Sequence, residues 1–211
     1  MILVSLTTAL HLSVGALASC PQKPRRQAEL HWSRHDRVVS PDSRWLIEVQ
    51  PDFSDNKSSV RLRDCQQDRS WTLFTLERDA VLHWSPDSKS LLIVNSPGAG
   101  DDEVRVFPVD ALSEGRQMSA SDTTADSVVH RAVVRQLGRN RQVQFYLARF
   151  VVWKRNRVVL AIGGQTTNGD TGPLRTYCYG FEIDVVSQQV LRSLSRDQLR
   201  RRYGTSCVVS P

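Results

Sequence analysis

The hydrophobic positions of this chain follow a period of two over much of its length. Val60 and Leu62 alternate with charged neighbours, and Val104 and Val106 do the same. Such alternation is typical of strands with one buried face, because successive side chains of a strand point to opposite sides of the sheet. It predicts strands at residues 59–64, 71–76, 103–107, 174–184 and 189–194.

A turn motif recurs along the chain and organises these strands. Val39–Ile47, Val-Ser-Pro-Asp-Ser-Arg-Trp-Leu-Ile, returns 45 residues later within Trp84–Ile93, and Val152–Leu160 is a shortened copy without the proline. In the full copies, Pro presets φ for a turn and the Asp that follows bonds nearby backbone N–H groups. We therefore expect three antiparallel meanders of three or four strands, the second without a visible fourth strand.

The repeated turns resemble the blade motif of TolB-type, WD-repeat-like β-propellers, where a Ser-Pro-Asp-Gly turn joins the first two strands of each blade. Ser43 and Ser88 stand where that family usually has Gly. The resemblance implies a mainly β fold whose antiparallel meanders form three propeller blades. Closed propellers have roughly four to eight blades. We therefore expect an open or incomplete propeller or a curved sandwich, and self-association could complete a ring.

Two segments have a helical pattern instead. In residues 126–138 the apolar side chains have the spacing of one helical stripe, and Gly138 is a signal for the end of the helix. Residues 196–203 follow a capping-box pattern made by Ser195 and Gln198. This short second helix has only two apolar side chains, so we expect them to dock it on the last meander while its arginines point to solvent.

The first residues have the features of an export signal. Residues 1–19 contain no charged side chain, and their apolar run is too short and too polar for a bilayer span of about 20 residues. The segment 17–20, Leu-Ala-Ser-Cys, resembles the lipobox of bacterial lipoproteins, which implies a lipid anchor on Cys20. Alternatively, Ala-Leu-Ala at 16–18 is a site for the ordinary signal peptidase.

After the signal peptide of residues 1–19, we expect residues 20–27 to be a basic tether and residues 28–211 to form a single β-rich domain. Apolar residues make up 40% of the chain and charged residues 24%, which argues against wholesale disorder. An exported protein of this kind would be periplasmic or membrane-anchored.

The cysteine pairing depends on how the signal is processed. Lipidation of Cys20 would leave Cys65, Cys178 and Cys207, enough for one disulfide and one free thiol. Without lipidation, four cysteines allow three pairings. A disulfide between Cys178 and Cys207 would fasten the C-terminal tail to the last meander, in keeping with an oxidising compartment, although Cys65 is an equally available partner by sequence.

The strands also predict a core. We expect it to contain the following side chains: Trp45, Leu46, Ile47, Trp84, Leu92, Val94, Val104, Val106, Val159, Ile162 and Phe181.

No arrangement of residues points to catalysis, to a metal or to a cofactor, and we predict none of these. His31 and His35 have the spacing of two ligands on a helix, but the strand that follows argues against a helix there. Asp42 and Asp87 are explained by the turn motif. We expect His83, at a strand end, to be half-exposed structure.

Charge adds one further feature. Lys and Arg total 28 against 22 Asp and Glu, and the basic excess concentrates at 23–44, 131–157 and 192–202. We do not expect nucleic-acid binding, because no recognition fold or series of stacking aromatics is visible. Anionic envelope polymers or lipid headgroups suit this charge better, and a scattered solvated surface is the alternative interpretation.

Together, the export signal and the blade-like repeats favour a non-enzymatic binding module in the cell envelope. Its partner would be an envelope protein not identifiable from sequence, and a lipid on Cys20 would attach it to the membrane. The alternative function is a hydrolase built on a propeller-like scaffold, because propellers host binding, scaffolding and catalysis alike.

Overall fold

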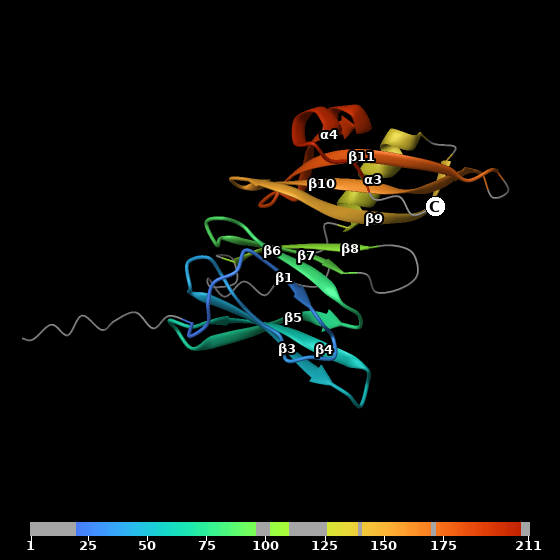
Figure 1. Cartoon of the computed structure of the whole chain (residues 1–211). Coiled ribbons are helices and arrows are strands. Elements are labelled where there is room, and N and C mark those ends of the chain that lie inside the picture. Colours follow the sequence, from blue (N-terminus) through green and yellow to red (C-terminus); the bar gives the residue numbers. More distant parts are fainter. Residues whose placement is uncertain (1–19, 96–101, 110–125, 139–140, 170–171, 208–211) are drawn as a thin grey trace, which may run out of the picture.

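The computed structural model describes residues 20–95, 102–109, 126–138, 141–169 and 172–207. The predicted signal peptide of residues 1–19 lies outside these ranges. Within them the protein is mainly β, with three four-stranded antiparallel sheets and two helices (Figure 1). This confirms the fold class predicted from the period-two pattern and the repeated turns.

Sheet 1 is the first predicted meander, with its strands in the order β2-β3-β4-β5. These are β2 (Arg37–Val39), β3 (Trp45–Asp52), β4 (Lys57–Asp64) and β5 (Arg69–Leu76). β4 shows the period-two pattern seen in the sequence, since Ser58, Val60, Leu62 and Asp64 are buried and the residues between them are not. One face of the sheet therefore belongs to the core, and the other is mainly polar apart from Val39 and Leu46, which pack against Cys20.

Sheet 2 has the order β1-β6-β7-β8. Its strands are β1 (Gln27–Leu30), β6 (Ala80–Trp84), β7 (Ser90–Asn95) and β8 (Glu103–Pro108). The fourth strand that the second repeat lacks is supplied from the N-terminal end of the chain. β1 pairs antiparallel with β6, with Gln27 opposite His83 and Leu30 opposite Ala80.

Sheet 3 is the last meander, in the order β12-β11-β10-β9. Its strands are β9 (Arg141–Lys154), β10 (Arg157–Asn168), β11 (Arg175–Asp184) and β12 (Gln189–Ser195). The shortened third copy of the motif is the β9–β10 turn, as predicted. Arg155 takes the left-handed conformation there, with φ of 52°.

The three sheets are stacked face to face, with sheet 2 in the middle (Figure 1). β7 shows this most clearly, because it is buried at every position. Its Leu91 and Ile93 belong to the core shared with sheet 1, and its Leu92 and Val94 to the core shared with sheet 3. All eleven side chains predicted for the core are buried.

The two helices flank sheet 3 on opposite faces. α3 (Asp126–Leu137) packs Val129 and Val133 into the core between sheets 2 and 3. α4 (Arg196–Tyr203) covers the other face, where Leu199 is fully buried. Both bonds of its predicted capping box are present, and the helix ends at a left-handed Gly204. Docking through Leu199 and Tyr203 is confirmed.

The repeated turn folds identically in sheets 1 and 2. Trp45 N–H donates to Ser40 Oγ over 2.9 Å, and Ser90 N–H donates to Ser85 Oγ over the same distance. Each of these serine hydroxyls donates to the Asp two residues later. The turns also meet, because Asp42 N–H donates to Ser88 Oγ over 3.0 Å. The motif therefore shapes each hairpin and joins the two sheets at one end.

Residues 20–27, predicted to be a tether, lie against the domain. Cys20 N–H donates to the Ser43 carbonyl over 2.9 Å, Arg25 N–H donates to the Val39 carbonyl over 3.0 Å, and Pro24 forms a parallel bridge with Val39. The side chain of Cys20 is buried. The segment thus runs along the edge of β2 before it enters sheet 2 as β1, a connection that local sequence does not reveal.

Candidate functional site

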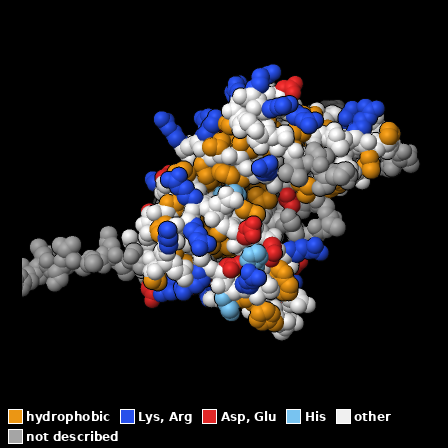
Figure 2. Space-filling model, in the orientation of Figure 1, with side chains coloured by type: hydrophobic (Ala, Val, Ile, Leu, Met, Phe, Trp, Pro, Cys, Tyr) orange, Lys and Arg blue, Asp and Glu red, His pale blue; other side chains and the backbone are white. Residues whose placement is uncertain are grey.

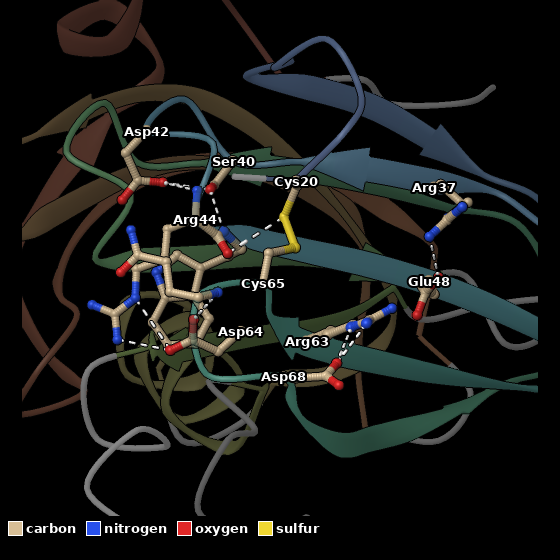
Figure 3. Close-up of a disulfide and its surroundings, with 12 residues drawn as sticks. Cys20, Arg37, Ser40, Asp42, Arg44, Glu48, Arg63, Asp64, Cys65 and Asp68 are labelled. Atoms are coloured by element: carbon tan, nitrogen blue, oxygen red, sulfur yellow. Dashed lines mark hydrogen bonds and ion pairs between the residues drawn. A yellow bond between two sulfur atoms is a disulfide. The ribbon is translucent and has the colours of Figure 1, made fainter. Parts of the chain in front are cut away.

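All four cysteines are paired. One disulfide joins Cys178 to Cys207, with Cα atoms 5.6 Å apart, and links the tail after α4 to β11. This is the pairing considered from the sequence. The other joins Cys20 to Cys65, with Cα atoms 5.4 Å apart (Figure 3). A lipid thioether and this disulfide would use the same sulfur atom, so the predicted lipidation of Cys20 and the disulfide are mutually exclusive.

An ion pair lies beside the N-terminal disulfide (Figure 3). Arg44 donates from Nε and Nη2 to Asp64 Oδ2 over 3.2 and 2.8 Å, and the Asp64 side chain is fully buried. Burial alone would raise the pKa of Asp64. The bonds from Arg44 and from the N–H groups of Gln66 and Gln67 outweigh it, so its pKa lies below the usual value. The pair holds the end of β4 in place, and both residues have structural partners.

His83 has a structural role. His83 is buried, with 6% of its surface exposed, which corrects the expectation that it would be half-exposed. Its ring stacks on Phe150 of β9, with centroids 4.1 Å apart, and so bridges sheets 2 and 3. Burial lowers the pKa of His83 to about 4. His31 Nδ1 lies 3.1 Å from Asp79 Oδ2, whereas His35 is exposed on the surface.

Asp42 and Asp87 lie where the turn motif predicts them. Asp42 and Asp87 each accept hydrogen bonds inside their own turn, from Ser40 and Ser85 respectively. Within the described part of the chain, no three His, Cys, Asp or Glu side chains lie close enough together to hold a metal ion. The same part contains no helix long and apolar enough to cross a bilayer.

The most distinctive surface is basic and surrounds α4. We call it the arginine face and define it by nine residues: Arg149, Lys154, Arg155, Arg157, Arg192, Arg196, Arg200, Arg201 and Arg202. All nine side chains are exposed. Figure 2 shows Lys and Arg side chains gathered over the top of the molecule, where α4 lies in Figure 1.

Strand register places the sheet residues of this face on the same side as α4. Val159 and Ala161 pack beneath the helix with Leu199. Arg149 pairs with Ala161. Across the sheet, Val159 pairs with Glu182, which in turn pairs with Arg192. Directly paired residues of adjacent strands project to the same side of a sheet. The strands and the helix therefore present one continuous cationic surface.

Few of these charges are neutralised. Arg157 bonds Glu182 over 3.1 Å, and Lys154 Nζ donates to the Tyr203 hydroxyl over 2.7 Å. Among the described residues, Arg157 is the only one of the nine that makes an ion pair with a carboxylate. The negative end of the helix dipole favours arginines in the last turn of α4, but it explains neither Arg149 nor Arg192.

The net positive charge of the chain is concentrated in the part that contains sheet 3 and α4. Residues 141–207, which contain sheet 3 and α4, have 11 Lys and Arg against 4 Asp and Glu. Residues 20–108, which contain sheets 1 and 2, have 13 against 14. The net charge of +6 is therefore a property of one sheet and its helix, not of an evenly basic surface.

All three basic stretches were predicted from the sequence, but their arrangement in the fold was not. The 131–157 and 192–202 blocks meet around sheet 3, because the β9–β10 turn and α4 lie on one side of it. The 23–44 block lies among the acidic residues of sheets 1 and 2. A count of charge per predicted meander, instead of per sequence block, would have found the asymmetry.

Comparisons with known proteins add little to this geometry. No family model matches the sequence, and no curated protein matches it either. Among solved structures, one similar chain is described as the beta-propeller domain of the Trilobed protease from Pyrococcus furiosus, with an open velcro topology. It is 12% identical, with a TM-score of 0.41 over 78% of this chain and 53% of that chain. This chain therefore spans about half of that length, and so loose a likeness carries no argument here.

Proposed function

We propose that this chain is a non-enzymatic binding module that binds an acidic partner protein through the arginine face. The observation that carries the proposal is the group of exposed arginines around α4, most of them without a carboxylate partner in the described residues, on a molecule whose other two sheets are almost neutral. Arginine forms paired hydrogen bonds with carboxylates and is enriched at protein interfaces.

A partner protein suits this face better than insertion into a lipid bilayer. Helices that lie in a membrane surface need an exposed apolar side as well as a basic one. In α4, Leu199 is fully buried under the helix and Tyr203 packs beside it. The exposed side of α4 is cationic, so it has charge to offer to a partner but no apolar stripe to insert.

We propose further that the protein is exported and keeps Cys20 in a disulfide. Two disulfides in a chain with a signal-like first segment support an oxidising compartment. This favours cleavage after Ala18 over a lipid on Cys20. Mass mapping of the mature protein under non-reducing conditions distinguishes the two, because it should recover a peptide containing Cys20 linked to Cys65. A diacylglyceryl group on Cys20 would contradict this part of the proposal.

A capture experiment from envelope extracts tests the binding function. The bait is the wild-type protein, with two triple variants of equal charge loss. Arg196→Gln, Arg200→Gln and Arg201→Gln remove charge from α4, whereas Arg25→Gln, Arg34→Gln and Arg78→Gln remove it from exposed positions elsewhere. Circular dichroism confirms that all three baits are folded.

The proposal predicts a protein that the wild type and the control variant capture, that the α4 variant loses, and that roughly 0.5 M salt releases, since salt screens exposed charges. Equal capture by all three baits would contradict it. So would binding only to anionic vesicles, or turnover of an ester or peptide substrate, which would favour the hydrolase alternative.

A further inference from the structure

A second basic site lies on the opposite side of sheet 3 from the arginine face. A cavity of about 260 Å³ opens between α3 and the turn that joins β11 to β12. Its polar lining comes from Arg131 and Arg135 of α3 and from Gln188 and Gln189. α3 packs on the face of sheet 3 that turns toward sheet 2, whereas α4 covers the other face. The cavity is therefore separate from the surface to which we assign partner binding.

The two arginines are placed to hold one anionic group. Arg131 and Arg135 are four residues apart on α3, so they lie on the same side of the helix with their Cβ atoms about 6 Å apart. Both side chains are exposed, and neither forms an ion pair with a carboxylate among the described residues. Among the described residues that line the cavity, none is Asp or Glu. Two neighbouring guanidinium groups without an acidic residue beside them attract a carboxylate or another anion.

The remaining walls of the cavity are apolar. Val128 and Ala132 of α3 and Val190 of β12 complete its lining. Ala132 is buried and the two valines are half-buried. The short lining, with two arginines beside a few apolar side chains, suits a small ligand better than a large one. A ligand with one charged end and a short aliphatic stem would match both parts of the lining.

We propose that this cavity binds a carboxylate on a short aliphatic stem. Two sources share this chemistry: a free short-chain carboxylic acid, and a Glu side chain of a polypeptide. In the bound state the carboxylate lies between Arg131 and Arg135, with the Gln189 amide at the rim, and the stem contacts Val128, Ala132 and Val190. The site does not depend on the function proposed for α4.

An NMR titration of ¹⁵N-labelled protein tests the site. Butyrate represents the free acid, and N-acetyl-glutamate amide represents the Glu side chain. Butyramide and N-acetyl-glutamine amide are the neutral counterparts of equal shape. We expect saturable shift changes at the backbone amides of α3 and of Gln188–Val190 with at least one of the two acids, and none with its neutral counterpart. The acid that binds more tightly identifies the source.

Two variants make the test specific. The double variant Arg131→Gln and Arg135→Gln should weaken binding at least tenfold, whereas Arg175→Gln, an exposed arginine outside the cavity, should leave it unchanged. Both changes are on the surface, so the fold is retained. Equal shifts with acid and amide, unchanged binding in the double variant, or shifts that rise without saturation would each overturn the proposal. The α4 variants should titrate like the wild type, so this result is independent of partner binding.

Discussion

At the scale of single residues, the repeated turn shows how a local motif is modified by its neighbours. Ser43 and Ser88 occupy the same position in their turns, with φ of 62° and 59°, where Gly is conformationally easier. Their side chains differ in environment. Ser43 is half-buried, while Ser88 is buried and its hydroxyl accepts the Asp42 N–H of the other turn.

We predict opposite effects of Gly at these two positions. Ser43→Gly relieves a left-handed conformation and should change the free energy of unfolding by between zero and about +1 kcal/mol. Ser88→Gly relieves the same conformation but removes the acceptor of the Asp42 N–H, so it should be about 1 kcal/mol less stable than Ser43→Gly. Urea unfolding of the two variants side by side measures the difference. Equal stability would mean that the contact between the turns contributes nothing.

His83 gives a prediction about acid stability. Its pKa is lowered by burial from 6.5 to about 4, so between these values an unfolded chain binds a proton that the folded protein does not. The contribution of His83 to the free energy of unfolding should therefore be fully present above pH 6.5. It should be lost as the pH drops toward 4, and the loss should be about 3 kcal/mol at most. His83→Phe keeps an aromatic ring against Phe150 and should lose much less stability over this window.

The comparison needs one control, because carboxylates also titrate near its lower end. His35→Gln changes an exposed histidine and should behave like the wild type. Chemical unfolding at pH 7, 6, 5 and 4 provides the data. If the His83→Phe variant loses as much stability as the wild type between pH 7 and 4, then burial of His83 is not the cause.

At the scale of elements, what could be read from the sequence was local. The hairpin turns, the period-two strands and the capping box of α4 are each specified by residues within a few positions of one another, and these were predicted correctly. The position of β1 was not, because its pairing with β6 joins residues 50 to 56 positions apart. The burial of His83 was missed for the same reason, since Phe150 belongs to another sheet.

The arginine face shows the same limit. The arginines of α4 and their exposure were predictable from the narrow apolar stripe of this helix. The arginines of the sheet that lie beside them were not predictable. Arg149 and Arg192 join them only through the register of four strands. A surface site assembled across a sheet therefore depends on pairing that a single sequence does not specify.

Gly180 of β11 provides the element-scale prediction, because α4 docks directly over it. A Cβ atom at this position would lie 2.7 Å from Leu199 Cγ and 3.1 Å from Leu194 Cβ. We predict that Gly180→Ala forces α4 away from the sheet and costs about 1–3 kcal/mol. Hydrogen exchange should rise at the amides of α4 and stay unchanged in β3 and β4. Unchanged exchange in α4 would show that the helix does not depend on this close approach.

At the scale of the whole molecule, the outer faces at the two ends of the three-sheet stack are mainly polar or covered by a helix. The outer face of sheet 1 carries an ion pair of 2.8 Å between Arg37 and Glu48, and Arg61 donates to Gln50 over 3.2 Å beside it. The outer face of sheet 3 is covered by α4. In the described part of the chain, neither end has the bare apolar face that a further blade would need, so we propose that the stack works without a second copy.

We propose that charge, and not exposed apolar area, is the basis for binding. Sheets 1 and 2 form a nearly neutral support, and sheet 3 with α4 presents the arginines. If the account is right, binding of an acidic chain depends on where the charge lies and not only on the net charge of the protein.

The affinity for poly-glutamate of about 50 residues tests this most directly, measured at the low ionic strength where exposed charges act over about 10 Å or more. The wild type is compared with the two triple variants, which lose the same charge from α4 or from Arg25, Arg34 and Arg78. We predict that the α4 variant binds at least tenfold more weakly and that the control binds within about twofold of the wild type. Equal weakening of both variants would contradict the account, because it would show that net charge, and not the arginine face, holds the acidic chain.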